Sequence, residues 1–283
     1  MDKKISKYEI ANCINVLGNF CGKRDIDELT AFELMKKYGV EKADVMVLFG
    51  GSILAGGDIL ANAMKNDVAK KYVIVGGRGN TTASLEEQFY KLYPDSDKNS
   101  ILSEISEAEI FRNYLKYKYN LQPDFLEIHS TNCGNNITNL LKLLKEKNIT
   151  FKNIIISQDA TMQLRMEAIL KKYLSENIKI INFAAYSAKV CVKDGKLCFE
   201  NDIFGMWDID RYITLLMSEI PRLTDDKNGY GPKGTGYIAH IDIPKDVKNA
   251  FLSLKQIYGD KVRKANPLYF LNKKISLNIK TDN

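Results

Sequence analysis

Three polar segments of this sequence combine small, hydroxyl and amide residues in a way that suits binding of a small molecule. Each directly follows a short apolar run. Two are glycine turns, whose backbone can approach a ligand closely and present N–H groups to an anion. The third is a run of hydroxyl and amide side chains, which can hydrogen-bond a sugar or a carboxylate. The candidate binding residues are Gly50-Gly51-Ser52, Gly76-Gly77-Arg78-Gly79 and Ser130-Thr131-Asn132 with Asn136. Tight-turn geometry and helix capping are the alternative explanations.

A fourth segment places charged residues after another apolar run. Gln158 and Asp159 end that run, and Met162 and Arg165 follow within two helical turns. Asp159 can cap the next helix, while Arg165 either faces solvent or extends back toward a ligand. Only seven of the 41 basic residues are arginines, and the planar guanidinium suits carboxylate or phosphate better than a lysine does. Arg78 and Arg165 are therefore the candidate anion-binding side chains.

Two further carboxylates are candidate ligand contacts. Glu107 stands near the start of a predicted helix, where the helix dipole favours an acidic residue in any case. Asp225 lies in a loop rich in glycine and aspartate, residues 222–236, whose role the sequence leaves open. A role for either side chain as a ligand contact needs support beyond the local sequence.

The elements that position these residues are predicted by apolar periodicity. Five continuous apolar runs, typical of parallel strands covered on both faces, occupy residues 45–49, 72–75, 125–128, 153–156 and 178–183. The segments between them carry apolar residues at helical spacing, for example Ile137, Leu140, Leu141 and Leu144. Strands alternating with helices predict an α/β protein with a Rossmann-like, doubly wound, mainly parallel sheet.

We expect three parts along the chain. Residues 1–40 form a helical segment that packs on the core, residues 41–200 the Rossmann-like domain, and residues 201–283 a mostly helical C-terminal subdomain. Within the second part, Asp194-Gly195 predicts a two-residue hairpin turn that places Cys191 opposite Cys198, both as free thiols. In the third, Pro221 is expected to end a helix, and residues 237–243 to form a strand.

Composition excludes several classes of protein. The net charge of +6 includes no Lys/Arg run longer than a pair, so we expect no nucleic-acid partner. Five cysteines without a CxxC pair and only two histidines predict no metal site. No run of 18 apolar residues exists and the first 12 residues contain no signal-like apolar core, so we expect a cytoplasmic protein without a membrane contact. Neither glycine turn is a GxGxxG or Walker motif, which disfavours NAD.

Several of these motifs together resemble a known family. They are Ser130-Thr131-Asn132-Cys133-Gly134-x-Asn136, Gln158-Asp159-x-Thr161-Met162-Gln163-x-Arg165 and Glu107-Ala108, with Trp207, Arg211-Tyr212, Glu219-x-Pro221-Arg222-Leu223, Asp225-Asp226, Gly229-Tyr230-Gly231-Pro232 and Gly234 in the tail. The chain is thereby similar to the YdcF-like proteins, bacterial members of domain-of-unknown-function family 218, from about residue 10 to 250. One family feature is missing, because residues 61–70 offer only lysine where the wider family has an arginine.

The resemblance implies a Rossmann-like core, a helical C-terminal part and binding of a nucleotide-type cofactor, S-adenosyl-L-methionine. With that ligand, Glu107, Asp159 or Asp225 could face its cationic groups or accept from its ribose hydroxyls. It implies no catalytic residue, so a methyltransferase with an unidentified acceptor is one hypothesis. A second is an enzyme acting on a phosphorylated or nucleotide-linked small molecule, with Arg78 and Arg165 on the anion and Glu107 or Asp159 as base. A third is a non-catalytic ligand sensor. The oligomeric state is not predicted.

Overall fold

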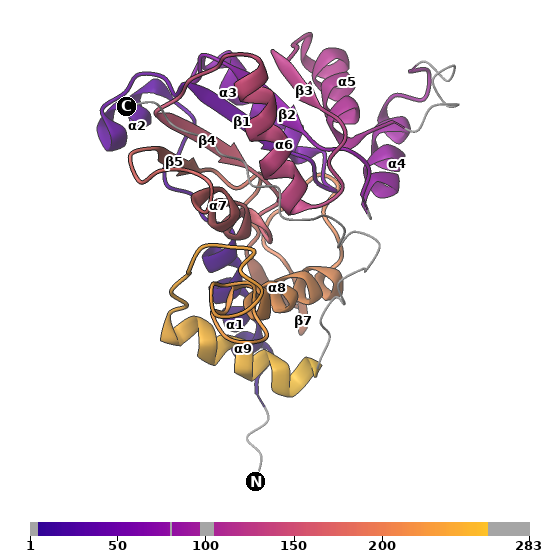
Figure 1. Cartoon of the computed structure of the whole chain (residues 1–283). Coiled ribbons are helices and arrows are strands. Elements are labelled where there is room, and N and C mark those ends of the chain that lie inside the picture. Colours follow the sequence, from indigo (N-terminus) through magenta and orange to yellow (C-terminus); the bar gives the residue numbers. More distant parts are fainter. Residues whose placement is uncertain (1–4, 80, 97–104, 260–283) are drawn as a thin grey trace.

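A parallel sheet organises the computed structural model, which describes residues 5–79, 81–96 and 105–259 (Figure 1). Its strands are β1 (Val45–Phe49), β2 (Tyr72–Val75), β3 (Phe125–Glu127), β4 (Asn153–Ser157) and β5 (Lys179–Asn182). They lie in the order β3-β2-β1-β4-β5, and every pair is parallel. The predicted α/β, Rossmann-like, doubly wound architecture is confirmed.

The middle of the sheet is apolar because helices cover both of its faces, and polar residues stand at the ends of β3, β4 and β5. Along β1 all five residues are buried, with Val47 packing in one core and Met46 in the other. The five helices between the strands are α3 (Ala55–Lys65), α4 (Thr82–Leu92), α5 (Glu107–Tyr119), α6 (Cys133–Glu146) and α7 (Gln163–Lys171). Apolar residues of α3, α4 and α5 pack in the second core, and those of α6 and α7 in the first.

The remaining elements come before β1 and after β5 in the chain. They are α1 (Lys7–Cys21), α2 (Ala31–Tyr38), the hairpin strands β6 (Val190–Lys193) and β7 (Lys196–Phe199), α8 (Ile209–Leu223) and α9 (Lys245–Tyr258). Helix α1 packs against α9, β6 and α8. Helices α1, α8 and α9 and the hairpin strand β7 lie in the lower half of Figure 1. The helices expected near the N-terminus and after Trp207 are therefore present; residues 260–283 lie outside the described part. Among the described residues, no helix has the length and apolarity needed to cross a bilayer.

The hairpin has the predicted register. Val190 pairs with Phe199 and Cys191 with Cys198. Both turn residues, Asp194 and Gly195, have the positive φ that a tight two-residue turn requires.

Two predictions about the C-terminal part are wrong. Helix α8 continues past Pro221 to Leu223. Pro221 lies in the last turn of the helix, where the missing N–H removes only one hydrogen bond, so the helix tolerates it there. Residues 237–243 form no strand. Ile238 N donates to the Tyr230 carbonyl at 3.0 Å and Ala239 N to the Ala168 carbonyl at 2.9 Å, so this segment hydrogen-bonds a loop and a helix and has no partner strand.

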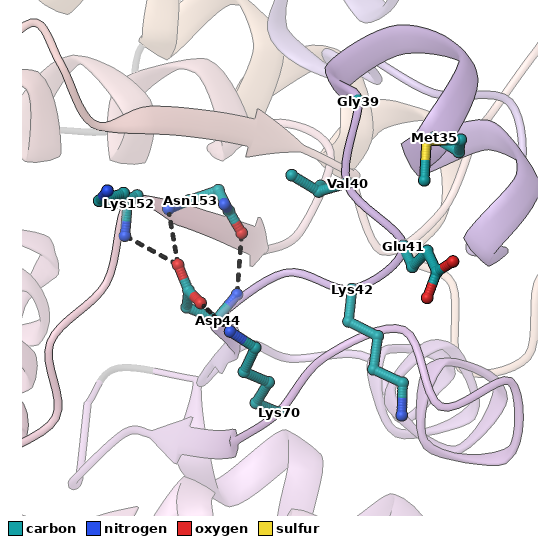
Figure 2. A pocket seen from close by; sticks show the side chains of 9 residues that line it. All are labelled: Met35, Gly39, Val40, Glu41, Lys42, Asp44, Lys70, Lys152 and Asn153. Carbon is teal, nitrogen blue, oxygen red and sulfur yellow. Dashed lines mark hydrogen bonds and ion pairs between the residues drawn. The ribbon is translucent and has the colours of Figure 1, made fainter.

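A pocket of about 560 Å³ lies at the amino ends of β1 and β4, the edge opposite to the predicted site (Figure 2). Asp44 on its wall ties the two strands together. Its carboxylate accepts from Lys152 N at 2.8 Å, Asn153 N at 3.2 Å and Lys70 Nζ at 2.7 Å. Burial alone would raise the pKa of Asp44, but these three donors hold it below its ordinary value.

We expect Asp44→Ala to lower the free energy of unfolding by about 1–3 kcal/mol, because it leaves two backbone N–H groups without an acceptor. Since the folded pKa of Asp44 is depressed, this stabilisation is present above its unfolded pKa and is lost as pH falls through the folded pKa. Urea unfolding at pH 7 and at low pH measures both effects. Lys70→Ala is the control and should cost less than about 1 kcal/mol, because Lys70 is exposed. Equal losses for both variants would contradict this role of Asp44.

Candidate binding site at the carboxyl edge of the sheet

The strand order reverses between β1 and β4. From β1 the chain adds β2 and β3 on one side, then returns to place β4 and β5 on the other. In open parallel sheets, ligands bind beyond the carboxyl ends of the strands at such a reversal. The residues that follow these two strands are Gly50-Gly51-Ser52 after β1 and Gln158-Asp159 after β4. The fold thus brings two of the four predicted segments to the expected place.

Asp159 links the two loops at this reversal. Ser52 donates to Asp159 Oδ2 through its backbone N at 3.2 Å and its Oγ at 3.3 Å. The Gln158 side chain crosses the same gap, because its Nε2 donates to the Gly50 carbonyl at 2.9 Å. Gln158 is itself fixed by Gln163, whose Oε1 accepts from Gln158 N at 2.8 Å. Asp159 is therefore a buried carboxylate in a rigid setting.

Glu107 approaches the same loops from α5. Its backbone N donates to the Gly77 carbonyl at 3.0 Å, which seats the start of α5 on the second glycine turn. The side chain is buried, and its Oε1 accepts from Thr82 Oγ1 at 2.9 Å and Thr81 Oγ1 at 3.3 Å. The predicted helix-start position of Glu107 is correct, and the side chain points inward at the sheet edge.

Adjacent glycines contact the two carboxylates. A Cβ on Gly50 would collide with Glu107 Oε2, and a Cβ on Gly51 would lie 2.8 Å from Asp159 Oδ1. A side chain at either position would therefore force the neighbouring carboxylate to shift, and glycine avoids this. Neither Glu107 Oε2 nor Asp159 Oδ1 accepts a hydrogen bond from any residue that the structure describes. Each carboxylate therefore retains one oxygen that could pair with a ligand.

Burial raises the pKa of both carboxylates. The pKa of Glu107 rises to about 7, chiefly through burial and also through the charge of Asp159, against hydrogen bonds from Thr82 and Thr81 and the charge of Arg78. The pKa of Asp159 rises to about 6 through burial, although Ser52 donates to it. Two buried acids in one site favour a bound cation, which would stabilise their ionised forms.

These shifts predict how stability depends on pH. A carboxyl whose folded pKa is raised binds its proton more tightly in the folded state, so its contribution to the free energy of unfolding falls as pH rises from the unfolded pKa to the folded one. We expect Glu107→Gln to weaken the fall in melting temperature between pH 5 and pH 8 in the ligand-free protein. Glu87→Gln on the exposed side of α4 is the control. Parallel melting curves for Glu107→Gln and the wild type would contradict the raised pKa.

The third predicted segment is joined to the second glycine turn. Gly77 N donates to Ser130 Oγ at 3.1 Å, and Asn132 Oδ1 caps α6 by accepting from Asn135 N at 2.9 Å. Thr131 is exposed and its Oγ1 contacts Asn135, whereas Asn136 is buried in the first turn of α6. Capping therefore accounts for Asn132, while Ser130 faces the glycine turn.

The N–H groups of the glycine turns are mostly engaged. Gly50 N donates to the Val75 carbonyl, Gly76 N to the Glu127 carbonyl and Gly79 N to Thr82 Oγ1. With Gly77 N on Ser130, four of the five candidate glycines donate within the protein. Gly51 N is the exception among the described residues. These turns therefore have few N–H groups left to bind an anion, in contrast to the prediction from sequence.

Three predicted side chains have protein partners of their own. Arg165 neither faces solvent nor extends to the glycine turns, because it forms a two-pronged ion pair with Glu219 on α8, at 2.6 and 3.0 Å. Arg78 Nη1 donates to the Ile105 carbonyl at 2.8 Å.

Asp225 accepts from Lys233 N at 2.7 Å and contacts His240 Nδ1 at 2.7 Å, and these contacts fold the loop of residues 222–236. Met162 precedes α7, and its N donates to the Asp159 carbonyl at 2.8 Å.

Two positioning residues were missed by the sequence analysis. Glu127, at the end of β3, accepts from His129 N at 2.7 Å and Asn139 Nδ2 at 3.0 Å, and so holds the loop that carries Ser130. Gln88 on α4 donates to the Ser52 carbonyl at 2.8 Å. The sequence offered one indication of Glu127, because it is a carboxylate at the end of an apolar run. Gln88 gives no such signal, because its partner is 36 residues away.

No family model matches this chain. Among the described residues, no group of three or more His, Cys, Asp or Glu side chains is arranged to hold a metal ion.

Proposed function

We propose that the protein binds a nucleotide-type cofactor with cationic groups, S-adenosyl-L-methionine, at the carboxyl edge of the sheet. The observation that carries the proposal is the pair of buried carboxylates, Glu107 and Asp159, beside Gly50 and Gly51 at the reversal of strand order. The resemblance to the YdcF-like proteins supports the same ligand.

The chemistry of this ligand suits the pair. S-adenosylmethionine carries an ammonium and a sulfonium, and either cation would pair with Glu107 Oε2 or Asp159 Oδ1. The ribose hydroxyls and the amino acid carboxylate would need neutral donors and acceptors, which Ser130 and the N–H of Gly51 offer. A cation in this site would keep both carboxylates ionised at neutral pH.

Arg78 and Arg165 already bind other groups of the protein, which favours this ligand over a phosphorylated one. A phosphate would need an anion site, and the glycine N–H groups are mostly occupied. Arg165 is paired with Glu219, and both side chains are largely buried, with exposed fractions of 14% and 6%. A phosphate beside Glu107 and Asp159 would also be repelled by their charges.

Calorimetry with S-adenosylmethionine, S-adenosylhomocysteine, ATP and NAD tests the proposal. We expect S-adenosylmethionine to bind, ATP and NAD to fail, and protons to be released on binding between pH 6 and 7, because the ligand lowers the raised pKa values of Glu107 and Asp159. Proton release is measured from the dependence of the binding enthalpy on the buffer. Tighter binding of ATP than of S-adenosylmethionine would refute the proposal.

Turnover separates a methyltransferase from a sensor. A methyltransferase converts S-adenosylmethionine to S-adenosylhomocysteine when an acceptor is supplied, whereas a sensor leaves its ligand intact. Chromatography of the ligand recovered after incubation with purified protein and candidate acceptors makes this distinction.

A further inference from the structure

The β6–β7 hairpin holds two cysteines directly opposite each other. Cys191 on β6 pairs in register with Cys198 on β7, and their sulfur atoms lie 3.5 Å apart. Both side chains are half-buried, so reagents in solution can reach them. All five cysteines lie in the described part of the chain, and this is the one pair among them whose sulfurs are in contact.

The hairpin geometry permits a bond between these sulfurs. Directly opposed residues of an antiparallel pair have Cα atoms about 4.5–5.5 Å apart. That range lies within the Cα separations of about 4.4–6.8 Å that disulfides usually span, and the two sulfurs would have to close from 3.5 Å to a bond length of about 2.0 Å. The tight turn at Asp194 and Gly195 fixes the register and keeps the two thiols opposed.

The surroundings favour an anionic disulfide as the oxidant. Lys193 and Lys196 flank the turn and are exposed. Two acids, Asp194 and Glu200, are also close, but Glu200 is paired with Lys189 at 3.1 Å, so the charges around the thiols sum to a small positive value. Oxidised glutathione carries net negative charge, so these lysines would raise its concentration near the thiols. In contrast, Cys21 is fully buried, and burial strongly raises its pKa.

We propose that Cys191 and Cys198 form a reversible redox pair that a low-molecular-weight disulfide of the glutathione class oxidises. One thiol, as its thiolate, attacks the glutathione disulfide and releases one glutathione, which leaves a mixed disulfide on the protein. The second thiol then loses its proton, attacks the bound sulfur and releases the second glutathione. The balance is one protein dithiol and one glutathione disulfide converted to one protein disulfide and two reduced glutathiones.

The hydrogen bond between the two thiols raises the pKa of Cys191. Since the thiolate is the attacking form, oxidation should become faster as pH rises from 7 to 9. The hairpin is anchored to α1 by two hydrogen bonds between Asn15 and Val190, at 2.9 and 2.7 Å. These bonds involve backbone atoms of Val190 and should remain when the disulfide forms. We therefore expect the thiols to react in the folded protein.

The experiment incubates the reduced, full-length protein with oxidised glutathione, then blocks free thiols and maps them by peptide mass spectrometry. We expect one peptide cross-link, between Cys191 and Cys198, that dithiothreitol reverses, while Cys13, Cys21 and Cys133 remain alkylatable after unfolding. Cys191→Ser and Cys198→Ser should each stop at a mixed disulfide with glutathione, and Cys13→Ser should behave as the wild type.

Three outcomes would overturn the proposal. They are a mixed disulfide with glutathione as the final product of the wild type, a cross-link that involves Cys13 or Cys133 instead, or a Cys191–Cys198 cross-link that forms only in denaturant. Circular dichroism of each variant confirms that the chain is folded, so none of these outcomes can arise from unfolding.

Discussion

Replacing Arg165 with methionine is expected to lower the free energy of unfolding by about 3–5 kcal/mol. Arg165 pairs through two nitrogens with the buried carboxylate of Glu219 and so joins α7 to α8. Methionine fills similar space but leaves the Glu219 carboxylate buried with only a weaker neighbour, Arg222 Nη1 at 3.6 Å. A buried charge that has lost its main partner is among the few changes that destabilise a protein this strongly.

Urea unfolding of Arg165→Met at pH 7 measures this cost, and the double variant Arg165→Met/Glu219→Leu is the matched control. Because the double variant removes both charges, it should recover most of the lost stability. If the single variant loses less than about 1 kcal/mol, or the double variant is the less stable of the two, the ion pair does not hold α7 to α8. The interpretation of Arg165 as a structural residue would then fail.

Replacing Asp159 with asparagine should weaken binding of S-adenosylmethionine by roughly tenfold to a hundredfold, as expected for loss of a hydrogen bond to a charged group. Asparagine retains an oxygen that can accept from Ser52 N and Oγ, so the loop after β1 keeps its anchor. The melting temperature of the ligand-free variant should stay within a few degrees of the wild type, because the substitution also removes a buried charge. Calorimetry and thermal unfolding measure the two effects.

Asp246→Asn is the control for Asp159→Asn, since Asp246 is an exposed residue in the first turn of α9 and should leave binding unchanged. Two results would count against the assignment: unchanged affinity in Asp159→Asn, or unfolding of that variant. The first would mean that Asp159 does not face the ligand, and the second that it serves as a structural link between β1 and β4.

Local patterns in the sequence were sufficient to predict the sheet and the hairpin. Continuous apolar runs such as 45–49 have no amphipathic alternation, so they predict strands covered on both faces, and the Asp194-Gly195 turn fixes a register by local geometry alone. The strand prediction for 237–243 failed because a partner strand, which local sequence does not reveal, decides whether an extended segment joins a sheet.

The site was harder to predict because side chains distant in sequence determine it. The partner of Arg165 is 54 residues away, and Thr82 reaches Glu107 across 25 residues. The glycine turns suggested an anion site, yet most of their N–H groups donate to neighbouring strands, to Ser130 or to Thr82. Burial, rather than residue type, makes Glu107 and Asp159 the distinctive pair, and burial follows from the complete fold.

A crystal structure of the protein grown with S-adenosylmethionine tests the central claim most directly. We predict ligand density beyond the carboxyl ends of β1 and β4, with the ammonium or the sulfonium against Glu107 Oε2 or Asp159 Oδ1. Ligand density at the amino-edge pocket beside Asp44 instead, or a carboxyl edge left without ligand at a saturating concentration, would contradict it.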